Sequence, residues 1–108
     1  MSNQLKLNKM KNTMLNKQVI VRADKAGVFF GTLANKEGDE VTLTNARKLY
    51  YWSGAKTVED IADKGVTNPD NCKFTATVNE ITIIGVCQIL PCTKDSIKCI
   101  NAVPIWKA

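Results

Sequence analysis

Histidine is absent from all 108 residues of the chain. Hydrolases with a serine or cysteine nucleophile commonly activate it with a histidine base, so this sequence cannot build a Ser-His-Asp or Cys-His arrangement. It also lacks a paired-carboxylate motif, a Walker loop and a Rossmann glycine fingerprint. We therefore predict that the protein is not an enzyme and carries no cofactor.

Metal-ligand spacing is missing as well, although the chain has four cysteines. Structural zinc sites need four close ligands at recognisable spacing, and no C-x-x-C pair is present. In a reducing cytosol such cysteines remain thiols, whereas two disulfides would fit only a secreted protein. We expect free thiols and no metal at Cys72, Cys87, Cys92 and Cys99.

Long hydrophobic runs are lacking too. No stretch approaches the roughly 20 apolar residues of a membrane span, and the lysine-rich start has no apolar signal-peptide core. The most apolar stretch, residues 81–90, is interrupted by Thr82 and Gln88. We expect no membrane association and a cytoplasmic protein.

The net charge of +5 is unevenly placed, because the first 17 residues hold four lysines and no acid. A positive balance favours nucleic acid or an acidic protein as a partner. We predict a flexible basic tail over residues 1–16 and a single β-rich domain over residues 17–108.

Apolar and polar residues alternate in several short runs, which is typical of strands. Residues 81–90 are apolar on both faces and predict a central strand. Thr57, with Asp60 three positions later, and Gly65 bracket one helix. Thr93 begins a short C-terminal helix that ends near residue 100. The expected fold class is mostly β (α+β): one small curved barrel or sheet with an inserted helix and a short C-terminal helix. The expected strands are residues 18–22, 28–33, 40–45, 47–52, 72–78 and 81–90, with a final edge strand over residues 103–106.

Two segments resemble the small Sm-like and SH3-like barrels. Residues 28–45 form a strand, an acidic turn and a second strand, similar to the first part of the Sm pattern. Gly31 lies in the middle of the first strand and predicts a bend, a bulge or a close approach of the backbone there. Residues 79–85 are similar to the second part of the Sm pattern. The helix between them departs from that pattern, so the resemblance implies a fold and no activity.

A more specific set of motifs resembles a family of small tailed-phage and prophage proteins of unknown function. They are VIVR at residues 19–22, AGVFFGTL at 26–33 and NARKLYYWSGA at 45–55, and the likeness extends over residues 17–108. The resemblance implies a phage source. Small phage proteins without catalytic motifs often bind a host protein, inhibit a defence effector or sequester a nucleotide signal.

Residues 47–52 contain the densest group of candidate binding residues. Aromatic rings beside cations can stack on a base and pair with its phosphate, or form a protein-binding hot spot. The alternative is that Leu49, Tyr51 and Trp52 fill the core while the cations are solvated. Alternation places Lys48, Tyr50 and Trp52 on one face, and Arg47, Leu49 and Tyr51 on the other.

Arg22 ends the first expected strand and could meet Arg47 in an anion site. It could equally form a weak surface pair with Asp24 or Glu40. Lys25, in the turn that follows, is a further candidate.

The adjacent Phe29 and Phe30 must point to opposite faces of their strand. One of them therefore needs cover outside the inner core, and Phe30 is retained as a candidate contact. A second subunit would provide this cover and make a homo-oligomer. The alternative cover is the C-terminal helix.

The leading hypothesis is a phage-encoded binding protein in the cytoplasm of the infected bacterium. It would counter a defence or redirect a host factor by binding a host protein or a nucleotide-like ligand. The alternatives are an Sm-like nucleic-acid-binding protein and a virion accessory protein.

Overall fold

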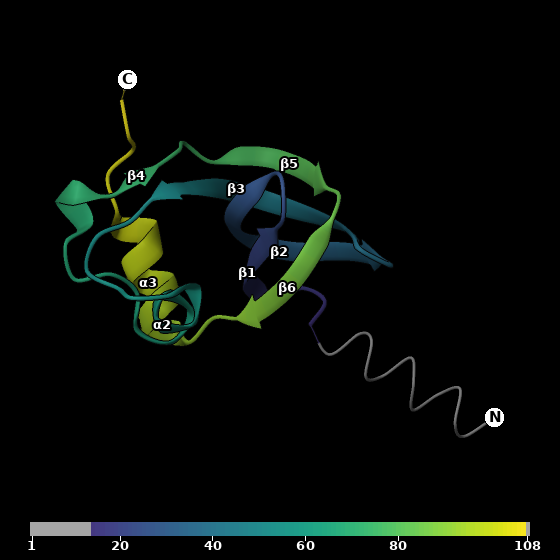
Figure 1. Ribbon diagram of the computed structural model, residues 1–108, viewed down its shortest axis with the longest axis horizontal. Coiled ribbons are helices and arrows are strands. Elements are labelled where there is room, and N and C mark those ends of the chain that lie inside the picture. Colours follow the sequence, from purple (N-terminus) through teal and green to yellow (C-terminus); the bar gives the residue numbers. More distant parts are fainter. Residues whose placement is uncertain (1–13, 108) are drawn as a thin grey trace.

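A computed structural model describes residues 14–107 of the chain. Three long strands form an antiparallel meander in sequence order, and three later strands extend it at its two edges (Figure 1). The strands are β1 (Gln18–Ala23), β2 (Gly27–Glu37), β3 (Glu40–Tyr51), β4 (Lys73–Phe74), β5 (Val78–Ile83) and β6 (Val86–Pro91). β6 pairs with β1, while β4 and β5 both pair with β3. The predicted mostly β class is confirmed, as a curved sheet that does not close into a barrel.

The sheet bends where the register between β2 and β3 shifts, between Phe30 and Thr32. The pairs Phe30↔Arg47 and Thr32↔Thr44 leave one extra residue on β3, and Asn45 there adopts a left-handed conformation with φ 50°. Gly31 sits at this bend, and a Cβ on it would lie 3.1 Å from the carbonyl oxygen of Thr44. The predicted close approach of the backbone at Gly31 is thus confirmed.

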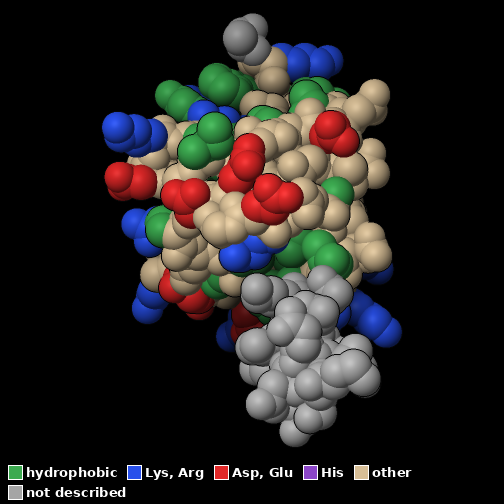
Figure 2. Space-filling view, turned by 90° about the vertical axis from the view of Figure 1, so that its right-hand side faces the viewer, with side chains coloured by type: hydrophobic (Ala, Val, Ile, Leu, Met, Phe, Trp, Pro, Cys, Tyr) green, Lys and Arg blue, Asp and Glu red, His purple; other side chains and the backbone are tan. Residues whose placement is uncertain are grey.

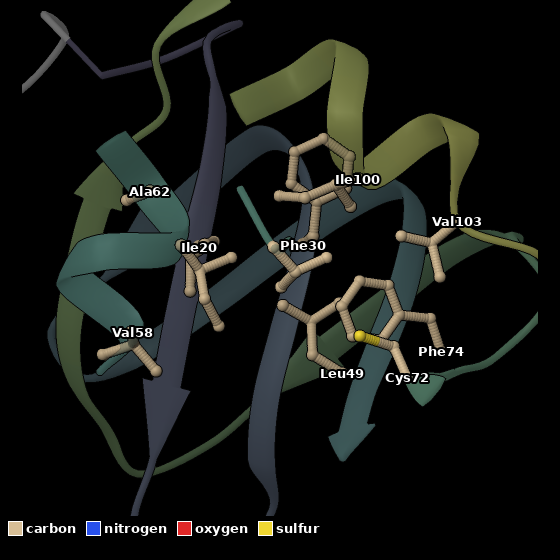
Figure 3. Close-up of a cluster of buried hydrophobic side chains, with 11 residues drawn as sticks. Ile20, Phe30, Leu49, Val58, Ala62, Cys72, Phe74, Ile100 and Val103 are labelled. Carbon is tan, nitrogen blue, oxygen red and sulfur yellow. The ribbon is translucent and has the colours of Figure 1, made fainter. Parts of the chain in front are cut away.

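Alternation along the strands separates two hydrophobic cores, one on each face of the curved sheet. The inner core comprises Val19, Val21, Ala23, Phe29, Leu33, Val41, Leu43, Ala46 and Ile83. The helix-side core, drawn in Figure 3, comprises Ile20, Phe30, Leu49, Val58, Ile61, Ala62, Val66, Cys72, Phe74, Ile100 and Val103.

Two helices cover the helix-side core, α2 (Val58–Lys64) and α3 (Lys94–Ala102), and a 3₁₀ turn spans Pro69–Asn71. Thr57 caps α2 by accepting a bond from the Asp60 amide, and Gly65 ends it with φ 83°. Thr93 caps α3 through the Ser96 amide. The cap signals predicted from the sequence are therefore confirmed.

The expected central strand over residues 81–90 is wrong. β5 ends at Ile83, Gly85 with φ 82° lies in the turn into β6, and these two strands lie at opposite edges of the sheet. The apolar residues on both faces of this stretch reflect two successive edge strands that each cover part of the inner core. A run of apolar residues does not reveal a turn when a single glycine makes it.

The predicted basic tail falls mostly on residues 1–13, which lie outside the described residues. Its last residues are described: Met14 and Leu15 pack against the inner core, and the Asn16 amide donates to the Leu33 carbonyl at 2.8 Å. None of the helices between residues 14 and 107 has the length and apolar composition of a membrane span.

Candidate functional site

A β-bulge near the end of β3 turns two aromatic residues toward solvent. The pairs Leu49↔Phe74 and Tyr51↔Lys73 place three consecutive β3 residues opposite two of β4. The extra residue breaks the alternation, and Tyr50 and Tyr51 are 60% and 50% exposed. The sequence-based assignment of Tyr51 to the face of Leu49 therefore fails at this position.

The exposed tyrosines meet the C-terminal segment. The rings of Tyr50 and Trp106 stack with centroids 5.1 Å apart and planes 10° from parallel. Lys73 lies beside both the C-terminal segment and β3, with its Nζ 5.4 Å from the Trp106 ring and 5.9 Å from the Tyr51 ring. We name this set, together with the exposed Ile105, the aromatic–lysine surface.

Backbone pairing with β4 holds the C-terminal half of this surface in place. Ile105 forms a parallel bridge with Phe74, and the Trp106 amide donates to the Phe74 carbonyl at 2.8 Å. The predicted edge strand near residues 103–106 is thus present as a single bridge. It brings Trp106 next to Tyr50, a residue 56 positions earlier in the sequence.

Arg47 lies beneath the aromatic–lysine surface, only 4% exposed. Its Nε and Nη1 each donate a 2.7 Å bond, to the carbonyls of Thr75 and Ile100. Its Nη2 is 3.4 Å from the carbonyls of Phe74 and Pro104. Burial lowers the pKa of the guanidinium from its ordinary value. Arg47 of β3 thus links its strand through hydrogen bonds to β4, α3 and the C-terminal segment.

Two neighbouring candidates point elsewhere. The Lys48 Nζ lies 5.6 Å from the Phe29 ring, on the inner-core side of the sheet. Trp52 is half-buried and packs against the helix-side core. Of Lys48, Tyr50 and Trp52, which the sequence places on one face, the structure therefore brings only Tyr50 into the aromatic–lysine surface.

The remaining candidates from the sequence do not join this surface. Arg22 is exposed and pairs in register with Gln88, near Glu59 of α2. The pKa of Glu59 is lowered, first by a 3.1 Å hydrogen bond from Gln88 and least by the charge of Arg22. Lys25 is exposed in the turn after β1. Arg22 thus faces α2, whereas Arg47 is held by β4 and α3.

Phe30 is 1% exposed and lies in the helix-side core with Ile100 of α3 (Figure 3). The C-terminal helix thus provides the cover that this ring requires, so Phe30 offers no reason for a second subunit.

Charge is distributed unevenly between the two ends of the molecule. Segments 45–57, 71–79 and 101–107, which contribute the aromatic–lysine surface and its surroundings, hold one arginine and four lysines but no acidic residue. Figure 2 shows the opposite end, where Asp and Glu side chains lie in the middle of the face and Lys and Arg side chains lie mostly around its rim. Asp24 and Asp39 both belong to that end, because the Asp24 amide donates to the Gly85 carbonyl in the β5–β6 turn and the Asp39 carbonyl accepts from the amide of Val86, the first residue of β6.

Two cavities lie away from the aromatic–lysine surface. One, of about 620 Å³, is lined by the loop before α2 and by Lys56 and Lys64. The other, of about 420 Å³, lies between α2 and β6. Within residues 14–107, no three side chains of the metal-ligating types are close enough to hold an ion.

Sequence reasoning found Tyr50 but missed Lys73 and Ile105 as parts of a site. The alternation of Lys73 with Cys72 and Phe74 does place Lys73 outward. Only the pairing of β4 with β3 shows that it lies next to the tyrosines.

The chain belongs to the family described as Domain of unknown function (DUF6948), whose sequence model matches residues 16–100. No curated protein matches the chain. The match includes β1 to β6 and most of α3, and it ends before the segment that carries Trp106.

Proposed function

We propose that this protein is a non-enzymatic binding protein that holds its partner at the aromatic–lysine surface. The observation that carries the proposal is the exposure of Tyr50, Tyr51 and Trp106 around one lysine. Tyrosine and tryptophan are the residues most enriched in binding hot spots. Large aromatic rings are otherwise favoured in the core of so small a protein, so their position in solvent supports a role in contact.

The proposal extends to a phage origin and a role in the cytoplasm of an infected bacterium. It is supported by the resemblance of the 19–22, 26–33 and 45–55 motifs to small phage proteins. The absence of histidine from the chain is consistent with binding rather than catalysis. The partner would be a host factor or a nucleotide-containing ligand, and the consequence would be the loss of a host defence.

The test compares phage growth with and without the gene on a panel of hosts that carry different defence systems. Loss of growth on at least one defended host, restored by the wild-type gene and by Ile84→Ala, is the expected result. Ile84 is an exposed apolar residue on the β5–β6 turn and serves as the matched control. The Tyr50→Ala/Trp106→Ala double variant should not restore growth. Unchanged growth on every host after deletion would contradict the proposed role.

A further inference from the structure

The aromatic–lysine surface places three exposed aromatic rings beside one positive charge. The rings of Tyr50 and Trp106 stack on each other and remain 60% and 38% exposed. Lys73 lies between Trp106 and Tyr51, within 6 Å of each ring, as two cation–ring distances of 5.4 and 5.9 Å show. A ring that accepts a base and a neighbouring ammonium that accepts its phosphate are the two elements of single-strand binding.

The surrounding charge favours an anionic partner over a neutral one. The three segments that contribute this end of the molecule contain no acidic residue. Of their five cationic residues, Lys73 and Lys107 are exposed near the rings, whereas Arg47 is buried, Lys48 lies on the inner-core side of the sheet and Lys56 lines a cavity. Lys107, one of these five, is exposed and directly follows Trp106. An anionic strand approaching here would meet no carboxylate side chain from these segments, whereas acidic residues gather at the opposite end (Figure 2).

The shape of the surface favours a polymer over a free nucleotide. Small ligands are usually held in concave pockets that bury most of their surface. Tyr50 and Tyr51 remain at least half exposed, and the two cavities described above are lined by other residues. Rings on an open surface bind bases only when those bases are unpaired, which excludes an intact duplex.

We propose that the aromatic–lysine surface binds a single-stranded nucleic acid, with bases stacked on Tyr50, Trp106 and Tyr51 and phosphates paired with Lys73 and Lys107. This inference rests on the proposed binding function and names its ligand. Recognition is independent of sequence, because stacking uses the ring face of any base.

The experiment measures fluorescence anisotropy of labelled oligo-U and oligo-dT of about 12 nucleotides with the full-length protein, at about 50 mM salt. The nuclease-treated protein should bind both strands and bind the matching duplex much more weakly. Tyr50→Ala and Trp106→Ala should each weaken binding roughly 5- to 100-fold. Trp106→Phe retains a ring and should recover part of the loss.

Charge and position are controlled separately. The slope of log K against log salt is negative, and Lys73→Gln should make it less steep by about 0.7, the value expected for one phosphate contact on a single strand. Lys36→Gln, at the acidic end, and Ile84→Ala should leave affinity unchanged. Far-UV circular dichroism confirms that each variant is folded, which is expected because the substituted residues are exposed.

Three outcomes overturn the inference: no binding of either strand, binding unaffected by the two aromatic substitutions, or tighter binding of a polyglutamate peptide than of either strand. The wider binding function falls if deletion of the gene leaves growth unchanged on every host, or if the Tyr50→Ala/Trp106→Ala variant supports phage growth as well as the wild type does. If only the nucleic-acid inference fails, the Tyr50→Ala/Trp106→Ala variant still does not restore phage growth.

Discussion

Nη1 of Arg47 donates a 2.7 Å hydrogen bond to the carbonyl of Ile100 in the last turn of α3, across 53 residues of sequence. This carbonyl belongs to the negative end of the helix dipole, which stabilises a nearby cation. The same guanidinium reaches Pro104, two residues before Trp106. The aromatic–lysine surface therefore depends on a buried charge that fixes the C-terminal segment against the sheet.

We expect Arg47→Met to lower the free energy of unfolding by about 2–4 kcal/mol, because hydrogen bonds from a charged group contribute about 1.5–3 kcal/mol each and the buried carbonyls lose their donor. Arg47→Lys should show an intermediate loss, since one ammonium cannot reproduce the planar fork. Urea denaturation followed by circular dichroism measures both values.

Lys48→Met is the matched control for Arg47→Met. Lys48 is the next residue of the same strand, and its side chain is half-buried and contacts the Phe29 ring. The substitution should cost less than about 1 kcal/mol, as a partly exposed cation–ring contact does. If Arg47→Met lowers the free energy of unfolding by no more than Lys48→Met does, the proposed stabilising role of the Arg47 hydrogen bonds is contradicted.

Local signals in the sequence were sufficient to predict the helices and most of the strands. Thr57, Gly65 and Thr93 act through bonds to residues three or four positions away, so their roles follow from spacing alone. Gly31 marked a bend for a similar reason, since a glycine inside a strand implies a close neighbour. The mostly β class follows from these elements.

The candidate site was harder to predict because it depends on pairing between distant strands. The bulge opposite Lys73 changes which β3 residues face solvent, and no feature within residues 47–52 announces it. Arg47 shows the same limit: a cation in a strand suggests exposure, but four carbonyls from distant segments bury it. Side-chain alternation is reliable only while the register is unbroken.

Gly54 is expected to tolerate alanine less well than Gly85, although both have positive φ, 92° and 82°. A Cβ at Gly54 would lie 2.6 Å from the Thr67 amide nitrogen, whereas no atom of residues 14–107 lies within 4 Å of a Cβ at Gly85. The left-handed conformation costs about 1–2 kcal/mol for an L-residue, and the clash at Gly54 should add about 1–3 kcal/mol. Equal losses in urea denaturation would show that the 53–57 loop can move away from Thr67.

Thr93→Ala should destabilise the protein more than Thr57→Ala, although both remove a helix cap. The Thr57 hydroxyl accepts one bond, from Asp60, and its loss should cost about 1 kcal/mol. The Thr93 hydroxyl also donates to the Asp63 carbonyl of α2 at 2.6 Å, so about 1 kcal/mol more should be lost. Thermal unfolding of the two variants measures the difference, and a larger effect at Thr57 would contradict this link between the helices.

Cys87 should react with iodoacetamide long before Cys92 at pH 8. Cys87 is exposed, whereas burial raises the pKa of the Cys92 thiol to about 11. Only the thiolate reacts, and with that pKa roughly one Cys92 thiol in a thousand is ionised at pH 8. Peptide mass spectrometry over time gives both rates. Comparable rates in the folded protein, with both slower than in urea, would contradict the burial of Cys92.

The stack between Tyr50 and Trp106 should contribute little to stability, so that its rings are free to serve a ligand. Aromatic pairs contribute about 0.5–1.5 kcal/mol beyond their buried area, and this pair is exposed, at 60% and 38%. A double-mutant cycle with Tyr50→Ala and Trp106→Ala should therefore give a coupling energy near 0.5 kcal/mol in urea denaturation. A coupling above about 2 kcal/mol would mean that the rings mainly fasten the C-terminal segment to the sheet. The weak coupling expected here, combined with a large effect of either substitution on ligand affinity, separates a binding surface from a structural clasp.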